Sequence, residues 1–211
     1  MLTRCGDDLF SMTADTPAEA QALAVQLRRD GDWLEVVPGI DTVLVRFDAA
    51  HEDAAAAEAA IQAVLERGAA PLAATADLVE IPVVDGGEHG PDLEARSAAT
   101  GLSADEIVAL HTSRDYPVDM VGFTPGFAFV GGLDDRLRVP RRKEPRQRVP
   151  AGSVGIADGR TGLYAMASPG GWTLIGRTPM RLFDAQAAEP FVLRPGMRVR
   201  FRAIVAHDFD A

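Results

Sequence analysis

The segment formed by residues 122–183 constrains the fold of this chain more than any other stretch. It holds eleven of the twenty glycines and six of the fourteen prolines, together with a dense run of arginines. Proline fixes φ and glycine opens backbone conformations that other residues avoid, so a segment rich in both has little helical potential. Short apolar runs between these residues instead predict strands joined by tight turns, which is typical of a barrel or a sandwich.

The region before residue 85 has a different pattern, in which strands and helices alternate. Thr16, Pro17 and Glu19 form a capping box that begins a helix, and Gly31 ends it. The alanine-rich stretch 53–67 predicts a second helix. Predicted strands cover residues 8–13, 33–37, 42–47 and 78–84. This order matches a ferredoxin-like unit, although the last strand can also belong to the next domain.

The remaining chain begins with two predicted helices, 91–100 and 104–111, which can cap or plug the barrel. Predicted short strands follow at residues 118–123, 128–130, 153–157, 161–166, 172–177 and 199–205. The last strand alternates, which places Val199, Phe201, Ala203 and Val205 inward. We therefore expect an α+β protein, with a small N-terminal ferredoxin-like α/β domain over residues 1–80 and a β-barrel domain over residues 81–211.

Composition excludes several classes of protein. No apolar run approaches the roughly 20 residues of a membrane helix, and the N-terminus does not resemble a secretory signal. The single cysteine, Cys5, fits a reducing compartment, so we expect a cytoplasmic protein. The four histidines are scattered, so no metal site is predicted. A net charge of −10 disfavours nonspecific binding to nucleic acid.

The charge is unevenly distributed along the chain. Residues 1–113 carry 6 basic and 21 acidic side chains, whereas residues 114–211 carry 15 and 10. This asymmetry indicates that the second region faces something anionic, or that arginines decorate a solvated barrel surface.

Residues 140–150, PRRKEPRQRVP, are called the strap below. Prolines recur every five residues and stiffen it, so its arginines are presented with little loss of entropy. Guanidinium groups suit phosphate and carboxylate recognition, and they also suit an acidic protein interface. Both interpretations stay open. The strap candidates are Arg141, Arg142, Arg146 and Arg148.

Two glycine loops follow the strap, at residues 151–155 and 168–172. Each places a serine beside glycines, whose backbone N–H groups can approach a ligand closely, although tight turns between strands explain either loop as well. Neither loop is a phosphate-binding P-loop, because the only lysine is Lys143. His111 shares a helical stripe with Ile107, which favours a structural histidine over a catalyst. No catalytic set is evident, and His111 and Arg177 are the only candidates.

Four stretches resemble a known family: GFTPGFAFVGGLDDRL, PRRKEPRQRVPAGSVGIA, TGLY and SPGGWTLIGRTPMRLF. Together with residues 81–123 they are similar to allophanate hydrolase subunit 1, a family also called KipI or the B subunit of 5-oxoprolinase. The sequence departs from the family pattern at Arg160, where family members usually have glutamine. The resemblance covers residues 81–201 best.

The resemblance implies a cyclophilin-like barrel and a cytoplasmic hetero-oligomer with two further chains of 5-oxoprolinase. These are the C subunit, a barrel protein like allophanate hydrolase subunit 2, and the A subunit. It implies an ATP-dependent hydrolase that opens 5-oxoproline to glutamate, with ATP as co-substrate and Mg²⁺ accompanying it. No tightly bound cofactor, nucleic acid or membrane is implied. The alternatives are a KipI-like inhibitor of a sensor histidine kinase and a subunit of an allophanate- or urea-related amide hydrolase.

Under the leading hypothesis, the strap arginines and Arg177 surround a developing phosphate. Hydroxyl groups orient the substrate, and glycines supply N–H donors. Besides the strap candidates, the predicted substrate- and nucleotide-binding residues are Ser153, Thr161, Tyr164, Ser168, Gly170, Gly171, Trp172, Arg177 and Thr178.

Overall fold

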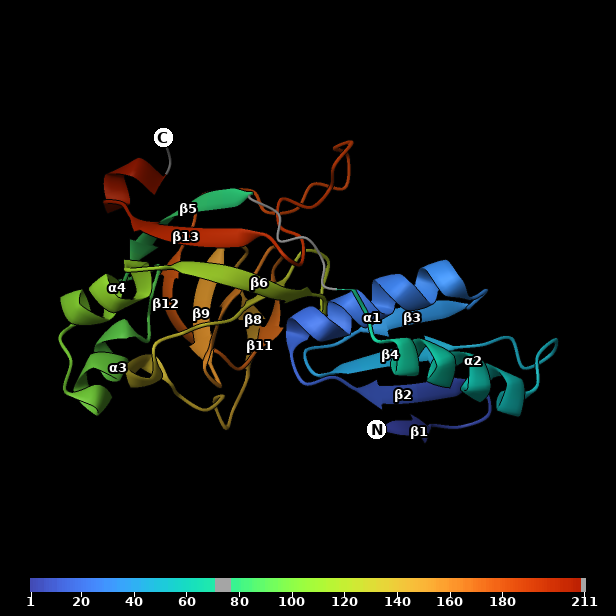
Figure 1. Ribbon diagram of the computed structural model, residues 1–211. Helices are drawn as coiled ribbons and strands as arrows, with labels where there is room; N and C mark the ends of the chain where they lie inside the picture. Colours follow the sequence, from blue (N-terminus) through green and yellow to red (C-terminus); the bar gives the residue numbers. More distant parts are fainter. Residues whose placement is uncertain (71–76, 210–211) are drawn as a thin grey trace. The chain divides into compact units, whose positions relative to one another are not determined.

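The computed structural model describes residues 1–70 and 77–209 and divides the chain into two compact units, Met1–Ala74 and Thr75–Ala211. We call them the first unit and the barrel unit and describe each by itself (Figure 1). Within the described residues, no helix combines the length and the apolar character that crossing a membrane requires. The prediction of an α+β chain with a barrel is confirmed.

The first unit is an antiparallel four-stranded sheet with two helices. Its elements are β1 (Leu2–Arg4), β2 (Leu9–Thr13), α1 (Pro17–Asp30), β3 (Glu35–Pro38), β4 (Thr42–Arg46) and α2 (Ala54–Arg67), and the strand order is β1-β2-β4-β3. Thr16 caps α1 as predicted, because its Oγ1 accepts a hydrogen bond of 3.1 Å from the Glu19 N–H, but the Glu19 carboxylate accepts the Asp15 N–H at 2.7 Å in place of the reciprocal bond of a capping box. Alternate strand residues such as Phe10 and Val45 pack with side chains of both helices, so one sheet face is covered.

The last strand of the predicted ferredoxin-like order belongs to the barrel, which is the second of the two alternatives that the sequence left open. The segment β5 (Leu78–Asp85) lies in the barrel, where it pairs in parallel with β13 (Arg198–Ala203) and antiparallel with β12 (Thr173–Arg177). The place beside β2 in the small sheet is taken by β1, whose three residues are too few to show a periodic pattern. Ile81 and Val83 are fully buried in the barrel core, which explains why β5 belongs there. The predicted boundary at residue 80 falls inside β5.

The barrel unit is built on a closed barrel with the strand order β10-β7-β6-β13-β5-β12-β9. Its other members are β6 (Asp115–Val121), β7 (Ala128–Val130), β9 (Ser153–Ala157) and β10 (Arg160–Leu163). The helices α3 (Leu93–Thr100) and α4 (Ala104–Thr112) pack against β12 and β13, respectively, and α4 contributes Ile107 and His111 to the buried interior. Two short 3-10 turns, η1 (Asp135–Leu137) and η2 (Ala206–Phe209), complete the unit.

The predicted alternation in the last strand holds only in part. Val199 and Phe201 are buried, but the strand ends at Ala203, which is exposed, and Val205 is 65% exposed. The three outward arginines of β13 are paired with carboxylates, since Arg198 and Arg200 contact Asp115 and Arg202 contacts Glu80. This arginine ladder is therefore charge-compensated and offers little to an anionic partner.

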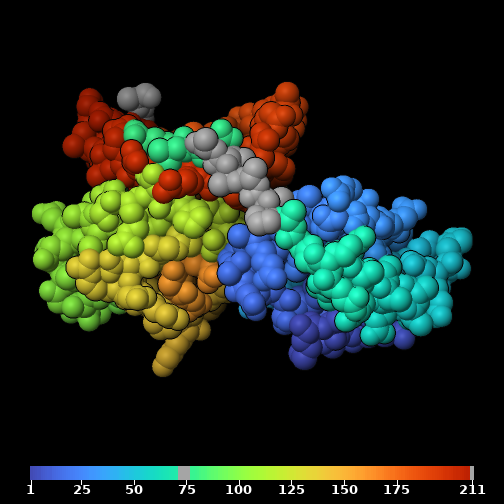
Figure 2. Space-filling view, viewed as in Figure 1, coloured from blue at the N-terminus to red at the C-terminus, as the bar shows by residue number. Residues whose placement is uncertain are grey.

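The strap contains a strand that the sequence analysis did not predict. Its second half, β8 (Arg146–Val149), pairs antiparallel with β11 (Ser168–Gly170), the second glycine loop, to form a two-stranded ribbon. The four residues between Pro145 and Pro150 are free to donate backbone hydrogen bonds, which is why a strand fits there. The gold-coloured part of the chain that includes the strap stands out from the surface of the barrel unit (Figure 2).

Candidate functional site

A basic cleft opens in the barrel unit where β8, β9 and β12 meet the loop before α3. Its cavity volume is about 120 Å³, and its lining comprises Arg146, Arg148, Ser153 and Arg177 together with Glu88, His89, Pro91, Pro150 and Leu174. We call it the arginine cleft. Strand pairing places Arg177 opposite Ser153. Four residues predicted from sequence thus lie around one cavity.

Asp92 holds the strap against the barrel. Its Oδ1 atom accepts hydrogen bonds from Arg146 Nη2 at 2.7 Å and from Arg142 Nη1 at 3.3 Å, while its Oδ2 atom accepts one from the Leu174 N–H at 2.7 Å. The carboxylate is shielded, with 13% of its side chain exposed. Asp92 therefore positions two of the strap arginines, and its negative charge compensates part of their positive charge. The sequence analysis missed this residue.

Donors remain for an anion in the arginine cleft. Arg146 Nη1 is buried and has no hydrogen-bond partner among the described residues. Arg148 is exposed and forms no ion pair with them. Arg177 donates its Nε–H to the Ala151 carbonyl at 2.8 Å and lies 5.2 Å from the ring centroid of Phe209. A cleft with such groups suits a phosphate or a carboxylate.

A second pocket, the aromatic pocket, lies where the strap meets the second glycine loop. Its walls are the rings of Phe123, Phe127, Phe129, Tyr164 and Trp172, with Gly170, Gly171 and Arg141 at its edge. The ring of Phe127 is central, with centroids of its neighbours 4.7 to 5.8 Å away. The predicted binding residues therefore divide between two pockets. The three phenylalanines were not predicted, although GFTPGFAF contains them all.

Two glycines seat Trp172 in the barrel wall. Gly155 of β9 faces Gly162 of β10, and a Cβ at Gly162 would lie 2.8 Å from Trp172 Cζ3 and 2.9 Å from Phe127 Cζ. A Cβ at Gly155 would lie 2.9 Å from Trp172 Cβ. These glycines are needed for close packing, which the motifs GSVG and TGLY signal only indirectly.

His111 has a structural environment. Thr161 Oγ1 donates to the Gly155 carbonyl at 3.2 Å, so His111 Nε2 must donate to Thr161 Oγ1 across 3.0 Å. The imidazole stacks on Phe201 with centroids 4.3 Å apart and is 1% exposed. Burial lowers the pKa of His111 to about 3, so it stays neutral. The geometry gives His111 and Thr161 a place in the barrel core and no contact with either pocket.

Three further candidates lie near the pockets without lining the cavities in which they were expected. Ser168 is buried, and its Oγ has no partner among the described residues. Thr178 is buried and accepts a hydrogen bond of 3.1 Å from the Met180 N–H. Arg142 is committed to Asp92 and to the Gly171 carbonyl, which its backbone N–H contacts at 2.7 Å. Arg160, the residue at which the sequence departs from the family pattern, donates a hydrogen bond of 3.2 Å from its Nε to Asp119 Oδ2.

Asp85 is a titratable group that sequence reasoning did not single out. It ends β5 opposite Gly176 of β12, and its Oδ2 atom is buried without a hydrogen-bond partner among the described residues. Burial raises the pKa of Asp85 to about 7, because water no longer stabilises its charged form. Its only sequence signal is its place at the start of the loop DGGEHG.

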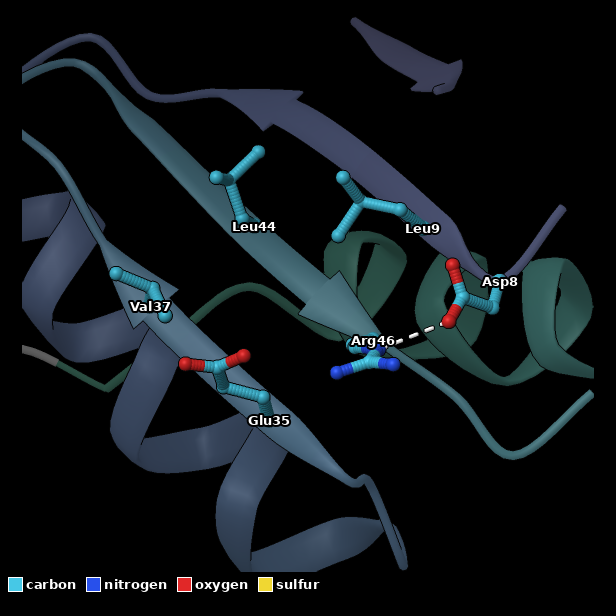
Figure 3. Close-up of a pocket in the computed structure, with 6 residues that line it drawn as sticks. All are labelled: Asp8, Leu9, Glu35, Val37, Leu44 and Arg46. Atoms are coloured by element: carbon cyan, nitrogen blue, oxygen red, sulfur yellow. Dashed lines mark hydrogen bonds and ion pairs between the residues drawn. The ribbon is translucent and has the colours of Figure 1, made fainter. Parts of the chain in front are cut away.

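A third hollow, of about 360 Å³, lies on the open face of the sheet in the first unit. Figure 3 shows its lining, in which Leu9, Val37 and Leu44 lie to one side of the charged residues. Glu35 lies beside Arg46, whose Nε is 2.8 Å from Asp8 Oδ2. Three apolar and three charged side chains line this hollow. All six buried side-chain polar atoms that lack a partner in the described residues lie in the barrel unit instead.

Comparison with known proteins supports a carboxyltransferase-type fold. The family model described as carboxyltransferase domain, subdomain C and D, matches residues 2–193. The B subunit of 5-oxoprolinase from Escherichia coli O157:H7 is 46% identical over 168 residues, which cover 80% of this chain and 77% of that protein. The B subunit of 5-oxoprolinase from Bacillus subtilis is 49% identical over 134 residues, which span 64% of this chain and 56% of that protein.

A solved structure matches the whole chain. The conserved uncharacterized protein PH0987 of Pyrococcus horikoshii is 36% identical, with a TM-score of 0.62 over 99% of this chain and 100% of that one. The chain therefore belongs to the family of carboxyltransferase domains, subdomain C and D, and has B subunits of 5-oxoprolinase among its relatives.

Proposed function

We propose that this chain is the B subunit of an ATP-dependent 5-oxoprolinase, which converts 5-oxoproline, ATP and water to glutamate, ADP and phosphate. The names of the relatives support this assignment. The observation that carries it is the convergence of Arg146, Arg148 and Arg177 on one cleft, where the buried Nη1 of Arg146 has no hydrogen-bond partner among residues 1–70 and 77–209.

The chemistry explains why such a cleft is useful. A lactam is a stable amide, and transfer of a phosphoryl group from ATP to its oxygen makes the carbonyl carbon open to attack by water. Negative charge grows on the transferring phosphoryl oxygens, and fixed guanidinium groups stabilise it without reorganising. The phosphate of ATP fits the donors of Arg146 and Arg148, while Ser153 offers a hydroxyl group beside them.

The arginine cleft does not fit the Mg²⁺ that accompanies ATP. Its charged side chains are three arginines and the single carboxylate of Glu88, and no group of three or more His, Cys, Asp or Glu in the described residues is arranged to hold a metal ion. Oxygen ligands for Mg²⁺ then come from the phosphates and from outside this chain. No step at the cleft is assigned to the metal.

The site as it stands in this chain is incomplete, which supports an enzyme of several chains. The arginine cleft supplies cations and a hydroxyl group, but the buried Asp85 and His111 do not line it. Nucleotide turnover therefore calls on partner chains, which we propose to be the C and A subunits of 5-oxoprolinase in a hetero-oligomer. The names of the relatives describe them as B subunits, which fits this proposal.

The test is glutamate release from 5-oxoproline and ATP by a mixture of this chain with the A and C subunits. Omission of this chain is expected to abolish the release of glutamate, and adding it back to restore the rate. An unchanged rate in its absence contradicts the proposed function. Inhibition of a sensor histidine kinase by this chain, with no effect on glutamate release, favours the inhibitor hypothesis instead.

A further inference from the structure

The aromatic pocket has an open wall that a packed core does not require. Phe123 is 69% exposed and adopts a φ of 71°, a conformation that costs a bulky side chain energy. The rings of Phe127, Phe129 and Trp172 beside it are at most 8% exposed. The strained, exposed ring of Phe123 thus stands at the rim of a hollow with a dry aromatic floor, a shape typical of ligand sites.

One buried donor faces this pocket. Tyr164 lines it and is 1% exposed. Its hydroxyl oxygen accepts the backbone N–H of Trp172, which leaves the hydroxyl proton to be donated elsewhere. Burial raises the pKa of Tyr164, so the proton stays in place to donate.

One cation stands at the rim. The guanidinium carbon of Arg141 lies 6.0 Å from the ring centroid of Trp172. Its carboxylate partner is Asp158, at 3.2 Å, and the two side chains are 60% and 53% exposed. Such an exposed pair is readily exchanged for another carboxylate. Arg141 is therefore available to a carboxylate ligand, whereas Arg142 is held by Asp92.

The size of the pocket limits what it can hold. Its volume is about 80 Å³, which admits a few water molecules or one small ring and excludes a nucleotide. Gly170 keeps the space open, since a Cβ there would collide with the Tyr164 hydroxyl group. Aromatic faces favour flat groups, so the occupant that fits is planar and small.

From these features we infer that the aromatic pocket binds a small, flat ring that bears one carbonyl group and one carboxylate. Tyr164 donates a hydrogen bond to the carbonyl oxygen, and Arg141 pairs with the carboxylate. Identification of this ring as the lactam 5-oxoproline rests on the proposed function. The strap then serves both pockets, with Arg141 at the ring and with Arg146 and Arg148 at the phosphate.

The experiment is a titration of the full chain, labelled with ¹⁵N at tryptophan, followed by NMR of the indole N–H groups. The chain has two tryptophans: Trp172 lines the pocket, and Trp33 belongs to the first unit and serves as an internal control. The probes are 5-oxoproline, 2-pyrrolidinone, which lacks the carboxylate, and glutamate, which lacks the ring. Trp33→Phe assigns the two signals.

The expected result is a saturable shift of the Trp172 signal with 5-oxoproline and no shift of the Trp33 signal. Binding of 2-pyrrolidinone and of glutamate is expected to be at least tenfold weaker. Arg141→Gln should reduce 5-oxoproline binding to the level of 2-pyrrolidinone, and Tyr164→Phe should weaken both ring compounds. The matched control Arg198→Gln, on the outer face of β13, should bind like the unmodified chain.

Three results overturn the inference: a Trp172 signal that 5-oxoproline does not move, equal binding of glutamate, or no effect of Arg141→Gln. A Trp172 signal that responds only to the C subunit of 5-oxoprolinase would show that the exposed Phe123 serves a protein interface instead. The test is independent of turnover. A mixture that releases no glutamate, combined with a shifted Trp172 signal, refutes the proposed function and leaves the ring pocket supported.

Discussion

The first unit and the barrel unit both enclose an apolar core, but they treat polar groups differently. The core of the first unit is aliphatic and aromatic, and every buried polar or charged residue identified in the described chain belongs to the barrel unit. The barrel unit also holds both non-glycine residues with positive φ in the described chain, Phe123 and Asp158. Its buried atoms that lack a hydrogen-bond partner in the described residues include Asp85 Oδ2 and Arg146 Nη1.

This difference indicates in which unit a local loss of stability has been retained. An unpartnered buried polar atom or a strained backbone lowers stability, so its persistence needs a compensating role. The first unit shows the consistency of a scaffold, with capped helices and regular strands. The barrel unit carries the exceptions, and those of Phe123 and Arg146 lie at the two pockets. The predictions below test whether these exceptions are functional.

The largest effect is expected from Arg146→Gln. Loss of one fixed cation at a developing phosphate should lower glutamate release roughly 100-fold or more, because its charge acts mainly in the transition state. Asp92→Asn should keep the Arg146 charge and only loosen the strap, with a smaller loss of rate. Steady-state kinetics of the reconstituted mixture compare the two. Equal losses would show that Arg146 acts only as the partner of Asp92.

Gly162→Ala should strongly disturb the barrel unit. The new methyl group meets Trp172 and Phe127 ring carbons, so overpacking should lower the free energy of unfolding by about 1–3 kcal/mol. Thermal unfolding followed by Trp172 fluorescence in a Trp33→Phe background measures it. Gly196→Ala is a poor control because of its positive φ, whereas Ala203→Gly, at the exposed end of β13, changes the backbone without touching either pocket. A native-like unfolding temperature for Gly162→Ala would contradict the packing described.

The stability of the barrel unit should depend on pH through two groups with opposite signs. The pKa of Asp85 is raised in the fold. Its stabilising contribution to the free energy of unfolding is therefore fully present below its unfolded pKa and is lost as pH rises through about 7. The pKa of His111 is lowered to about 3, so its contribution is present above the unfolded value and is lost as pH falls below about 6.5. The two slopes offset each other in mildly acidic solution.

Asp85→Asn removes the pH dependence of stability that comes from Asp85 and leaves the one that comes from His111. The variant should gain stability relative to the unmodified chain as pH rises from 4 to 8, by at most about 1.4 kcal/mol per pH unit. Hydrogen exchange of amides in β9 and β12 at several pH values reports this for the barrel unit alone. A difference between the two proteins that is constant with pH would show that Asp85 is not titrating in this range.

The smallest effect is expected on the open sheet face of the first unit. Leu44→Thr keeps a branched side chain at a position that is already 37% exposed, so the free energy of unfolding should change by less than about 0.5 kcal/mol. Glutamate release by the reconstituted mixture should remain the same. A loss of rate without a loss of stability would place a functional contact in the first unit and break the contrast between the units.

Much of the architecture was predictable because local signals agree with it. Thr16 begins a helix as expected, and glycine and proline punctuation indicated the barrel strands. The placement of β5 stayed open because its apolar alternation fits either domain, and only its partner β13, more than a hundred residues later, decides. Local pattern carries no information on such long-range pairing.

The site was predictable by residue type but not by arrangement. The strap arginines were found from composition, yet their division between Asp92 and the two pockets depends on contacts across some fifty residues. Asp85 and the phenylalanine rings were missed, because a carboxylate after a strand and apolar rings in a barrel are also ordinary structural residues. Asp85 is distinguished by the burial of an oxygen without a hydrogen-bond partner, and the phenylalanine rings are distinguished by the pocket that they line.

The central claim is that the arginine cleft of the barrel unit stabilises the anion in the reaction. Arg148 tests it most directly, since it lines the cleft and forms no ion pair with the described residues, so its removal leaves the fold intact. The measurement is glutamate release by the reconstituted mixture with Arg148→Gln and with the control Arg202→Gln, whose arginine pairs with Glu80 on β5. We expect at least a tenfold loss for Arg148→Gln and no loss for Arg202→Gln. Equal rates for the two variants would contradict the claim.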